Sequence, residues 1–270
     1  MIAAVIQYDI RPGKVDENRQ KALCHLEQAA AQGADVALLP ELWNCGYDLP
    51  HLADLAEDLH GESIGLVQEL AKKHRMHVFA GSIAELKDGQ YYNTQCAIND
   101  MGEMIAVYRK VHLFNPRLDE GKYFRAGDGW TLAQTPWGAV GLALCYDLRF
   151  PEFSRNLVLR GANMLTFPAQ WPGVRLNEWH ILCQGRAVEN RCFVLAANRI
   201  GTDMLENGEF VYEGGSRIIA PDGRILADAG DKEGAFSAEL DWDTLHAIRQ
   251  RNNVFSDRRP ILDEIDNSSL

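Results

Sequence analysis

Short apolar runs alternate with amphipathic helical segments along this chain, and this alternation restricts the chain to an α/β fold. Residues 35–41 form a nearly continuous apolar run, which is typical of a strand buried on both faces of a sheet. A predicted strand at residues 1–8 and a helical pattern that closes at Gly33 precede this run, so residues 1–41 are predicted to form a β-α-β unit. A helix at residues 66–74 and a strand at residues 77–86 follow.

The second half of the chain repeats the pattern, with Pro151 at the expected first turn of a helix. The predicted elements there are strands at residues 139–145, 163–168 and 192–197 and helices at residues 151–159 and 178–190. No linker separates the two halves. We therefore expect one layered α/β domain over residues 1–270.

Turn signals predict an antiparallel portion beside these β-α-β units. Asp88-Gly89 and residues 100–102 are expected to lead into strands at residues 91–98 and 104–110. The later predictions are an irregular segment at 127–138, strands at 216–220, 225–227 and 235–240, a helix at 242–249, and a polar C-terminal tail over about 252–270.

Charge and cysteine usage exclude several classes of protein. Lys and Arg number 27 against 38 Asp and Glu, a net charge of −11, so we expect no nucleic-acid binding. The N-terminal apolar run is too short for a signal peptide, and no later run approaches a membrane span. The six cysteines lack a CxxC spacing, which favours free thiols in the reducing cytoplasm. Dinucleotide, P-loop and zinc-protease motifs are absent, so neither a cofactor nor a metal is expected.

Three chemically distinct residues stand at the carboxyl ends of predicted strands: Glu41, Lys110 and Cys145. Ligand sites of α/β sheets lie at this edge, so the three side chains can converge. Together they supply a base, a cation and a nucleophile, the groups that covalent acyl transfer requires. A tight turn at Cys145 would aim backbone N–H groups at an oxyanion, and a following helix start would favour a thiolate. Taken singly, each residue also fits a structural thiol or a surface charge.

The surrounding motifs give the chain a resemblance to the nitrilase, or carbon–nitrogen hydrolase, superfamily over essentially its whole length. The matching segments are Leu-Pro-Glu at 39–41, Tyr-Arg-Lys-Val-His-Leu-Phe at 108–114 and Leu-Cys-Tyr-Asp-Leu-Arg-Phe-Pro-Glu at 144–152, supported by residues 185–190 and 215–223. The resemblance implies a four-layer α-β-β-α sandwich with a Glu-Lys-Cys triad.

Carried onto this sequence, the resemblance makes Glu41 the general base, Lys110 the oxyanion-side cation and Cys145 the nucleophile. The second active-site acid of the family falls on Glu120, with neighbouring Asp119 as the alternative. The family usually forms dimers that extend the sandwich, so a homodimer is expected. The candidate contact surfaces are the segment after the cysteine, the helix at residues 178–190 and the C-terminal tail.

The segment from Cys145 to Glu152 looks most like the ω-amidase and deaminated-glutathione-amidase branches, which implies a small aliphatic amide, possibly of a 2-oxo acid, as substrate. The product would be a carboxylic acid and ammonia, released through a thioester. Arg149 matches a position that holds a substrate carboxylate in carbamoylase relatives, or it pairs with Asp147. Candidate pocket residues are Tyr146, Arg149, Trp171, Tyr47 and Phe114, although aromatic residues beside strands are often core.

The same residues are also compatible with other functions. An N-carbamoyl amino acid hydrolase and a true nitrilase would use the same residues on another substrate. An idle scaffold that keeps the fold, and a redox-sensing thiol protein with a reactive Cys145 but no turnover, are the alternatives outside enzyme catalysis. His112, two residues after Lys110, is expected to pack its ring in the core rather than orient a neighbour.

Overall fold

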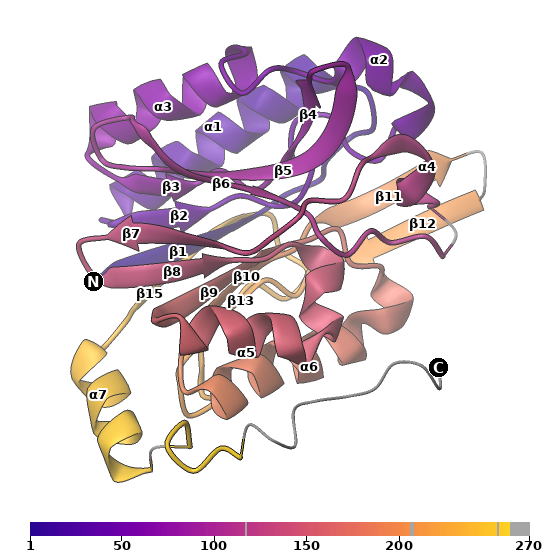
Figure 1. The fold of residues 1–270 in the computed structure, drawn as a ribbon. Coiled ribbons are helices and arrows are strands. Elements are labelled where there is room, and N and C mark those ends of the chain that lie inside the picture. Colours follow the sequence, from indigo (N-terminus) through magenta and orange to yellow (C-terminus); the bar gives the residue numbers. More distant parts are fainter. Residues whose placement is uncertain (117, 206–207, 253, 260–270) are drawn as a thin grey trace, which may run out of the picture.

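The structure is a computed structural model that describes residues 1–116, 118–205, 208–252 and 254–259. Two sheets lie face to face, and helices cover the outer face of each (Figure 1). The chain therefore forms the four-layer α-β-β-α sandwich that the sequence resemblance implied. Of the expected C-terminal tail, residues 253 and 260–270 lie outside the described part.

The first sheet has seven strands, and parallel pairing joins its three central ones, β1, β2 and β3. In spatial order its strands are β15 (Gly234–Glu239), β1 (Ile2–Gln7), β2 (Val36–Leu38), β3 (His77–Phe79), β5 (Gln90–Ile98) and β4 (Ile83–Lys87), with β6 (Met104–Arg109) paired to β5. Helices α1 (Val15–Ala31) and α3 (Glu62–His74) cover its outer face (Figure 1).

The second sheet has six strands around a parallel centre. Their order is β14 (Ile225–Asp228), β13 (Arg217–Ile219), β10 (Phe193–Ala197), β9 (Ala162–Pro168), β8 (Gly138–Leu142) and β7 (Thr131–Thr135). Helices α5 (Pro151–Leu159) and α6 (Leu176–Asn190) cover it. The remaining elements are β11 (Ile200–Leu205), β12 (Gly208–Glu213), α2 (Leu52–Leu55), α4 (Glu120–Tyr123), α7 (Trp242–Arg251) and the 3₁₀ turns η1 (Leu49–His51), η2 (Cys145–Arg149) and η3 (Gly173–Arg175).

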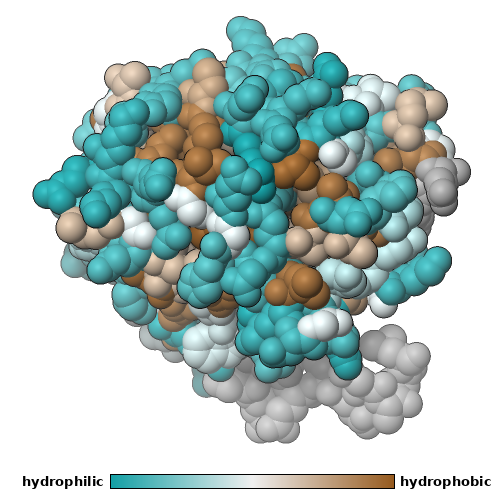
Figure 2. Space-filling view, turned by 90° about the horizontal axis from the view of Figure 1, so that it is seen from above, coloured by the Kyte–Doolittle hydropathy of each residue, from teal (hydrophilic) through white to brown (hydrophobic). Residues whose placement is uncertain are grey.

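The alternation of side chains along a strand explains why the central strands are apolar on both faces. In β1, Ala4 and Ile6 belong to the core beneath α1 and α3, whereas Ala3 and Val5 belong to the core between the two sheets. A third core lies between the second sheet and α5 and α6. The solvent side of the first helical layer is mostly hydrophilic, with small scattered apolar patches (Figure 2).

Three predictions about local structure were wrong. The predicted strand at 77–86 is two strands, because Gly81 adopts φ +49° and turns the chain between β3 and β4. The segment at 127–138, expected to be irregular, contains β7, which pairs antiparallel with β8. The strand predicted at 139–145 ends at Leu142, so Cys145 lies in the turn that follows.

The antiparallel hairpin of β11 and β12 was not predicted at all. It forms a two-stranded sheet of its own beside the two main sheets (Figure 1). None of the helices in the described ranges is long and apolar enough to cross a membrane.

Candidate active site

The ends of three strands from both sheets bring Glu41, Lys110 and Cys145 together. Glu41 lies three residues beyond β2, Lys110 directly follows β6, and Cys145 opens η2 after β8. The Glu41 and Lys110 side chains are fully buried, and Cys145 is 8% exposed. Ionisable groups are rarely buried this completely without partners, so the contacts within the cluster decide its chemistry.

The Lys110 ammonium bridges two buried carboxylates. Its Nζ donates to Glu41 Oε1 at 2.8 Å and to Glu120 Oε1 at 2.9 Å. Burial alone lowers the pKa of Lys110, but the negative charges of Glu120 and Glu41 outweigh it and raise the pKa above its ordinary value. Lys110 is therefore a permanent cation at this site.

Neutral amides fix the Glu41 carboxylate from two other sides. Asn93 Nδ2 donates to Glu41 Oε1 at 2.9 Å, and the backbone N–H of Gln170 donates to Oε2 at 3.0 Å. The Gln170 side chain also donates to the backbone carbonyl of Glu41 at 2.8 Å. Sequence reasoning missed Asn93 and Gln170, because nothing distinguishes a neutral amide near a strand end from any other polar residue.

The second buried acid is Glu120 and not Asp119. Asp119 adopts φ +51° and starts the short helix α4, which turns Glu120 inward. Tyr47 Oη donates to Glu120 Oε1 at 2.7 Å, and the Phe114 backbone N–H donates to Oε2 at 2.7 Å. Burial raises the pKa of Glu120; Lys110 opposes this shift and the negative charge of Glu41 adds to it.

Asp147 holds the turn that carries Cys145. Its Oδ2 accepts from the Leu144 backbone N–H at 2.8 Å and from Tyr108 Oη at 2.7 Å. Its Oδ1 lies 2.7 Å from Nδ1 of His112. The ion pair expected between Asp147 and Arg149 is therefore absent from these contacts, and the Asp147 carboxylate serves the turn instead.

His112 also does more than the expected packing. Its ring stacks on Phe150 with centroids 3.7 Å apart while the same ring contacts Asp147. It therefore both packs and helps to orient the carboxylate. The Cys145 backbone adopts φ +39°, a left-handed conformation that a non-glycine residue holds only when its surroundings enforce it.

The surroundings of the Cys145 thiol favour its protonated form, whereas the start of a helix was expected to favour a thiolate. Burial raises its pKa well above the ordinary value, and the charge of Glu41 adds to the rise more than Lys110 opposes it. A five-residue 3₁₀ turn does not offset these effects. Attack by this sulfur requires a base to remove its proton, and Glu41 is the buried carboxylate whose charge acts most strongly on it.

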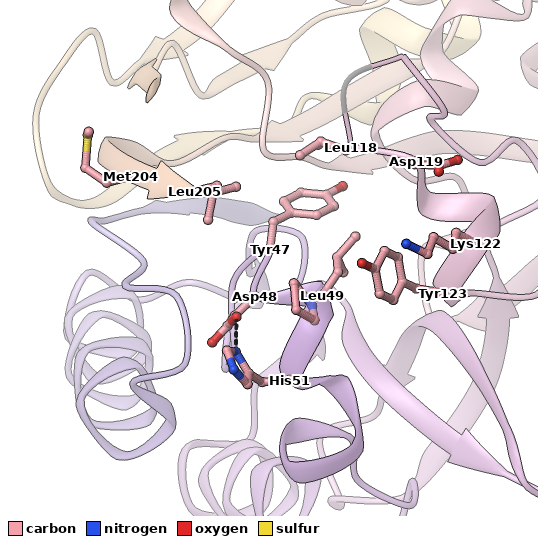
Figure 3. Close-up of a pocket in the computed structure, with 11 residues that line it drawn as sticks. Tyr47, Asp48, Leu49, His51, Leu118, Asp119, Lys122, Tyr123, Met204 and Leu205 are labelled. Carbon is pink, nitrogen blue, oxygen red and sulfur yellow. Dashed lines mark hydrogen bonds and ion pairs between the residues drawn. The ribbon is translucent and has the colours of Figure 1, made fainter. Parts of the chain in front are cut away.

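A narrow slot of about 40 Å³ leads to Cys145. All five predicted pocket residues line it, and they are joined by residues that were not predicted: Leu118, Gln170, Pro172, Arg175, Phe210 and Tyr212. Tyr47 and Leu118 also line a wider outer hollow of about 540 Å³, shown in Figure 3 with Tyr123 and Met204 on its walls. The slot therefore borders the hollow through residues that they share.

Two arginines line the slot. The Arg149 guanidinium lies 4.8 Å from the ring centroid of Trp171 and pairs with Glu178, rather than with the expected Asp147. Arg175 lies in η3, where its backbone carbonyl accepts from Trp171 Nε1 at 2.9 Å, and its side chain is exposed. Glu178 thus compensates the charge of Arg149, and the lining of the slot has a second guanidinium in Arg175.

Comparison with known proteins identifies the family of the chain. The family model for carbon-nitrogen hydrolase matches residues 2–250. The chain belongs to the carbon–nitrogen hydrolase family. It is thus a hydrolytic enzyme, as the sequence resemblance implied, and the predicted family is confirmed.

Named relatives share nearly the full length of the chain. The 2-oxoglutaramate amidase of Bacillus subtilis is 40% identical, with 94% of this chain and 96% of that protein covered. The omega-amidase NIT2 of Homo sapiens is 34% identical over 95% of this chain and 94% of that protein. A carbon-nitrogen hydrolase from Helicobacter pylori G27 has a similar structure, with a TM-score of 0.89, 27% identity, and coverage of 96% of this chain and 95% of that one.

Proposed function

We propose that this enzyme hydrolyses the ω-amide of a small 2-oxo acid to the dicarboxylic acid and ammonia, through a thioester on Cys145. The observation that carries the proposal is the buried cluster in which Lys110 holds Glu41 and Glu120 next to the thiol. The cluster provides a base, a fixed cation and a nucleophile at the end of a narrow slot.

The first half of the reaction forms the thioester. Glu41 accepts the thiol proton as sulfur attacks the amide carbon, and a tetrahedral oxyanion forms. The Lys110 ammonium and the backbone N–H of Tyr146 stabilise that oxyanion. Glu41 then returns the proton to the departing nitrogen, the C–N bond breaks, and ammonia leaves.

The second half repeats the proton transfers with water. Glu41 accepts a proton from a water molecule as the water oxygen attacks the thioester carbon. Lys110 and the backbone N–H of Tyr146 again stabilise the oxyanion. Collapse breaks the C–S bond, the acid is released, and the proton returns to sulfur. Glu120 takes no proton in this scheme; it fixes Lys110 and Tyr47 by hydrogen bonds.

The slot supports a small anionic substrate. Its volume of about 40 Å³ leaves little space for a bulky group beside the sulfur. Arg149 and Arg175 supply positive charge along the same slot, which suits a carboxylate at the far end of the substrate. The names of the relatives from Bacillus subtilis and Homo sapiens point to the same class of substrate.

Ammonia release from four substrate classes tests the proposal. 2-Oxoglutaramate, plain aliphatic amides, N-carbamoyl amino acids and nitriles are offered to the wild type and to C145A. We expect release from 2-oxoglutaramate that C145A loses. Release only from a carbamoyl amino acid or a nitrile would contradict the amide assignment, and no release from any class would favour a scaffold or a redox thiol.

The arginines provide a sharper version of this test. We expect R149M and R175M to raise KM for 2-oxoglutaramate while KM for an uncharged aliphatic amide stays unchanged. R224M serves as the control, because Arg224 is an exposed arginine that pairs with Asp222 and does not line the slot. Equal KM changes for the charged and the uncharged amide would contradict carboxylate recognition.

We also propose that the protein forms a homodimer through the α6 side of the molecule. We propose in addition that it is located in the reducing cytoplasm. Val174 is 89% exposed and Ile181 is 60% exposed on this side, and both are apolar. Light scattering at micromolar concentration tests the dimer, and a clean species of about the 30.2 kDa chain mass would contradict it. Cell fractionation tests the compartment.

A further inference from the structure

The hairpin of β11 and β12 contributes Tyr212, whose hydroxyl has no hydrogen-bond partner, to the lining of the slot. Along β12 the side chains alternate, so Phe210 and Tyr212 face inward while their neighbours face solvent. Tyr212 is 3% exposed, and its hydroxyl is sealed from solvent without a hydrogen-bond partner. A buried polar group without a partner lowers stability and is uncommon, so this hydroxyl requires an explanation.

The position of Tyr212 gives that explanation. The residue lines the same slot as Cys145 and Gln170. Burial raises the pKa of Tyr212; the charge of Arg199 opposes the rise, and the charges of Asp203 and Glu41 add to it, so the group stays a neutral hydrogen-bond donor.

A buried arginine fixes the Tyr212 ring. The Arg199 guanidinium lies 4.3 Å from the ring centroid, and Arg199 is fully buried. Its Nη1 donates to Asp203 Oδ2 at 2.7 Å and to Gln170 Oε1 at 3.1 Å. The hydroxyl is therefore held ready before substrate arrives, which lowers the entropy lost on binding.

We propose that Tyr212 is a specificity-determining residue whose hydroxyl donates a hydrogen bond to the 2-oxo oxygen of the substrate. This inference rests on the proposed function. It follows from the lining that these groups share: the thiol takes the amide carbon, and Arg149 and Arg175 suit the carboxylate at the other end of the substrate. The unpaired Tyr212 hydroxyl is then left to donate to an acceptor between these two ends. In a 2-oxo acid ω-amide, the oxo oxygen lies between the amide group and the carboxylate.

The test compares two amides that differ only at this oxygen: 2-oxoglutaramate, and glutaramate, in which a methylene replaces the oxo group. We expect Y212F to lower kcat/KM for 2-oxoglutaramate by about 10- to 100-fold and to leave kcat/KM for glutaramate nearly unchanged. The selectivity ratio between the two substrates then falls by the same factor, which a structural defect would not produce.

Y123F is the matched control, since Tyr123 lines the outer hollow and not the slot, and we expect it to keep the wild-type ratio. An unchanged ratio in Y212F would overturn the inference, and so would an equal loss for both substrates, which would assign the hydroxyl to the amide, the carboxylate or the fold. If wild-type enzyme hydrolyses neither amide, the proposed function itself fails. The two failures are therefore distinguishable.

Discussion

Replacing Lys110 with methionine tests the electrostatic reasoning about the site most directly. Methionine keeps an unbranched side chain but removes the ammonium that donates to Glu41 at 2.8 Å and to Glu120 at 2.9 Å. All three side chains are fully buried, so the change leaves two carboxylates without their cation. Breaking a buried ion pair by removing one partner destabilises a protein by about 3–5 kcal/mol.

The pH dependence of this loss has a definite sign. Burial already raises the pKa of Glu120 in the wild type, and without the ammonium, which opposes this shift, the pKa of Glu120 rises further. A folded-state pKa above the unfolded value of about 4.3 means that the folded K110M protein binds a proton which the unfolded chain has released. Its free energy of unfolding therefore falls as pH rises through that window, by about 1.4 kcal/mol per pH unit for each proton.

Urea unfolding of wild type, K110M and K122M at about pH 5, 6.5 and 8 measures this difference. K122M is the control, because Lys122 is exposed on the short helix α4 that also carries Glu120. We expect the loss in K110M relative to wild type to grow with pH, and amide hydrolysis to fall by at least about 10²–10³-fold. A loss below about 1 kcal/mol, or one that is the same at each pH, would refute the reasoning that Lys110 compensates both carboxylates.

Two further predictions concern the nucleophile and the loop that carries the base. E41Q removes a charge that raises the pKa of Cys145, so iodoacetamide alkylation of this thiol should begin at lower pH, while amide hydrolysis falls by about 10²–10⁴-fold. Mass spectrometry measures the adducts, with the exposed Cys24 as the reference thiol. An alkylation profile with the same pH dependence as in the wild type would contradict this coupling between Glu41 and Cys145. G81A should destabilise the enzyme far more than G89A, although both glycines have positive φ. A Cβ at Gly81 would lie 1.9 Å from the Pro40 carbonyl oxygen, whereas a Cβ at Gly89 would meet open space. In urea unfolding, G89A should lower the free energy of unfolding by about 1–2 kcal/mol, and an equal loss in G81A would show that the loop before Glu41 tolerates the contact.

The convergence of the three reactive groups could be predicted from sequence, because it depends on a general property of sheets. Glu41, Lys110 and Cys145 each follow an apolar run, and the carboxyl ends of neighbouring strands meet at one edge. What the sequence could not supply was the protonation of the thiol. That depends on the burial of Cys145 and on the charge of Glu41 beside it, neither of which a strand pattern specifies.

The elements that were missed carry conflicting local signals. β7 lies between Gly129 and Gly138, and glycines on both sides of a short run indicate a loop before they indicate a strand. The side chains of β12 alternate between buried and exposed in the structure, but the exposed side includes the apolar Val211. The sequence there therefore shows no strict alternation of apolar and polar residues. Pairing with β8 decides the first strand and pairing with β11 decides the second, where pattern alone does not.

Glu178 shows the same limit for a charged contact. A pairing between Arg149 and Asp147, two residues apart in the sequence, was a reasonable local expectation. The structure instead gives the Asp147 carboxylate to Tyr108, His112 and the backbone, and gives Arg149 a partner 29 residues away. Competition for one carboxylate among several donors is settled by three-dimensional position, which the spacing of two residues does not contain.

The hairpin of β11 and β12 belongs to neither main sheet, yet hydrogen bonds join it to the base. Arg199 stacks on Tyr212 and donates to Gln170, and Gln170 in turn donates both to the Glu41 carboxylate and to its backbone carbonyl. Substrate that contacts Tyr212 therefore acts on a side chain only two fixed residues removed from Glu41. Because Asp203 and Arg199 are buried and paired, this connection is rigid, and recognition of the substrate and placement of the base depend on the same contacts.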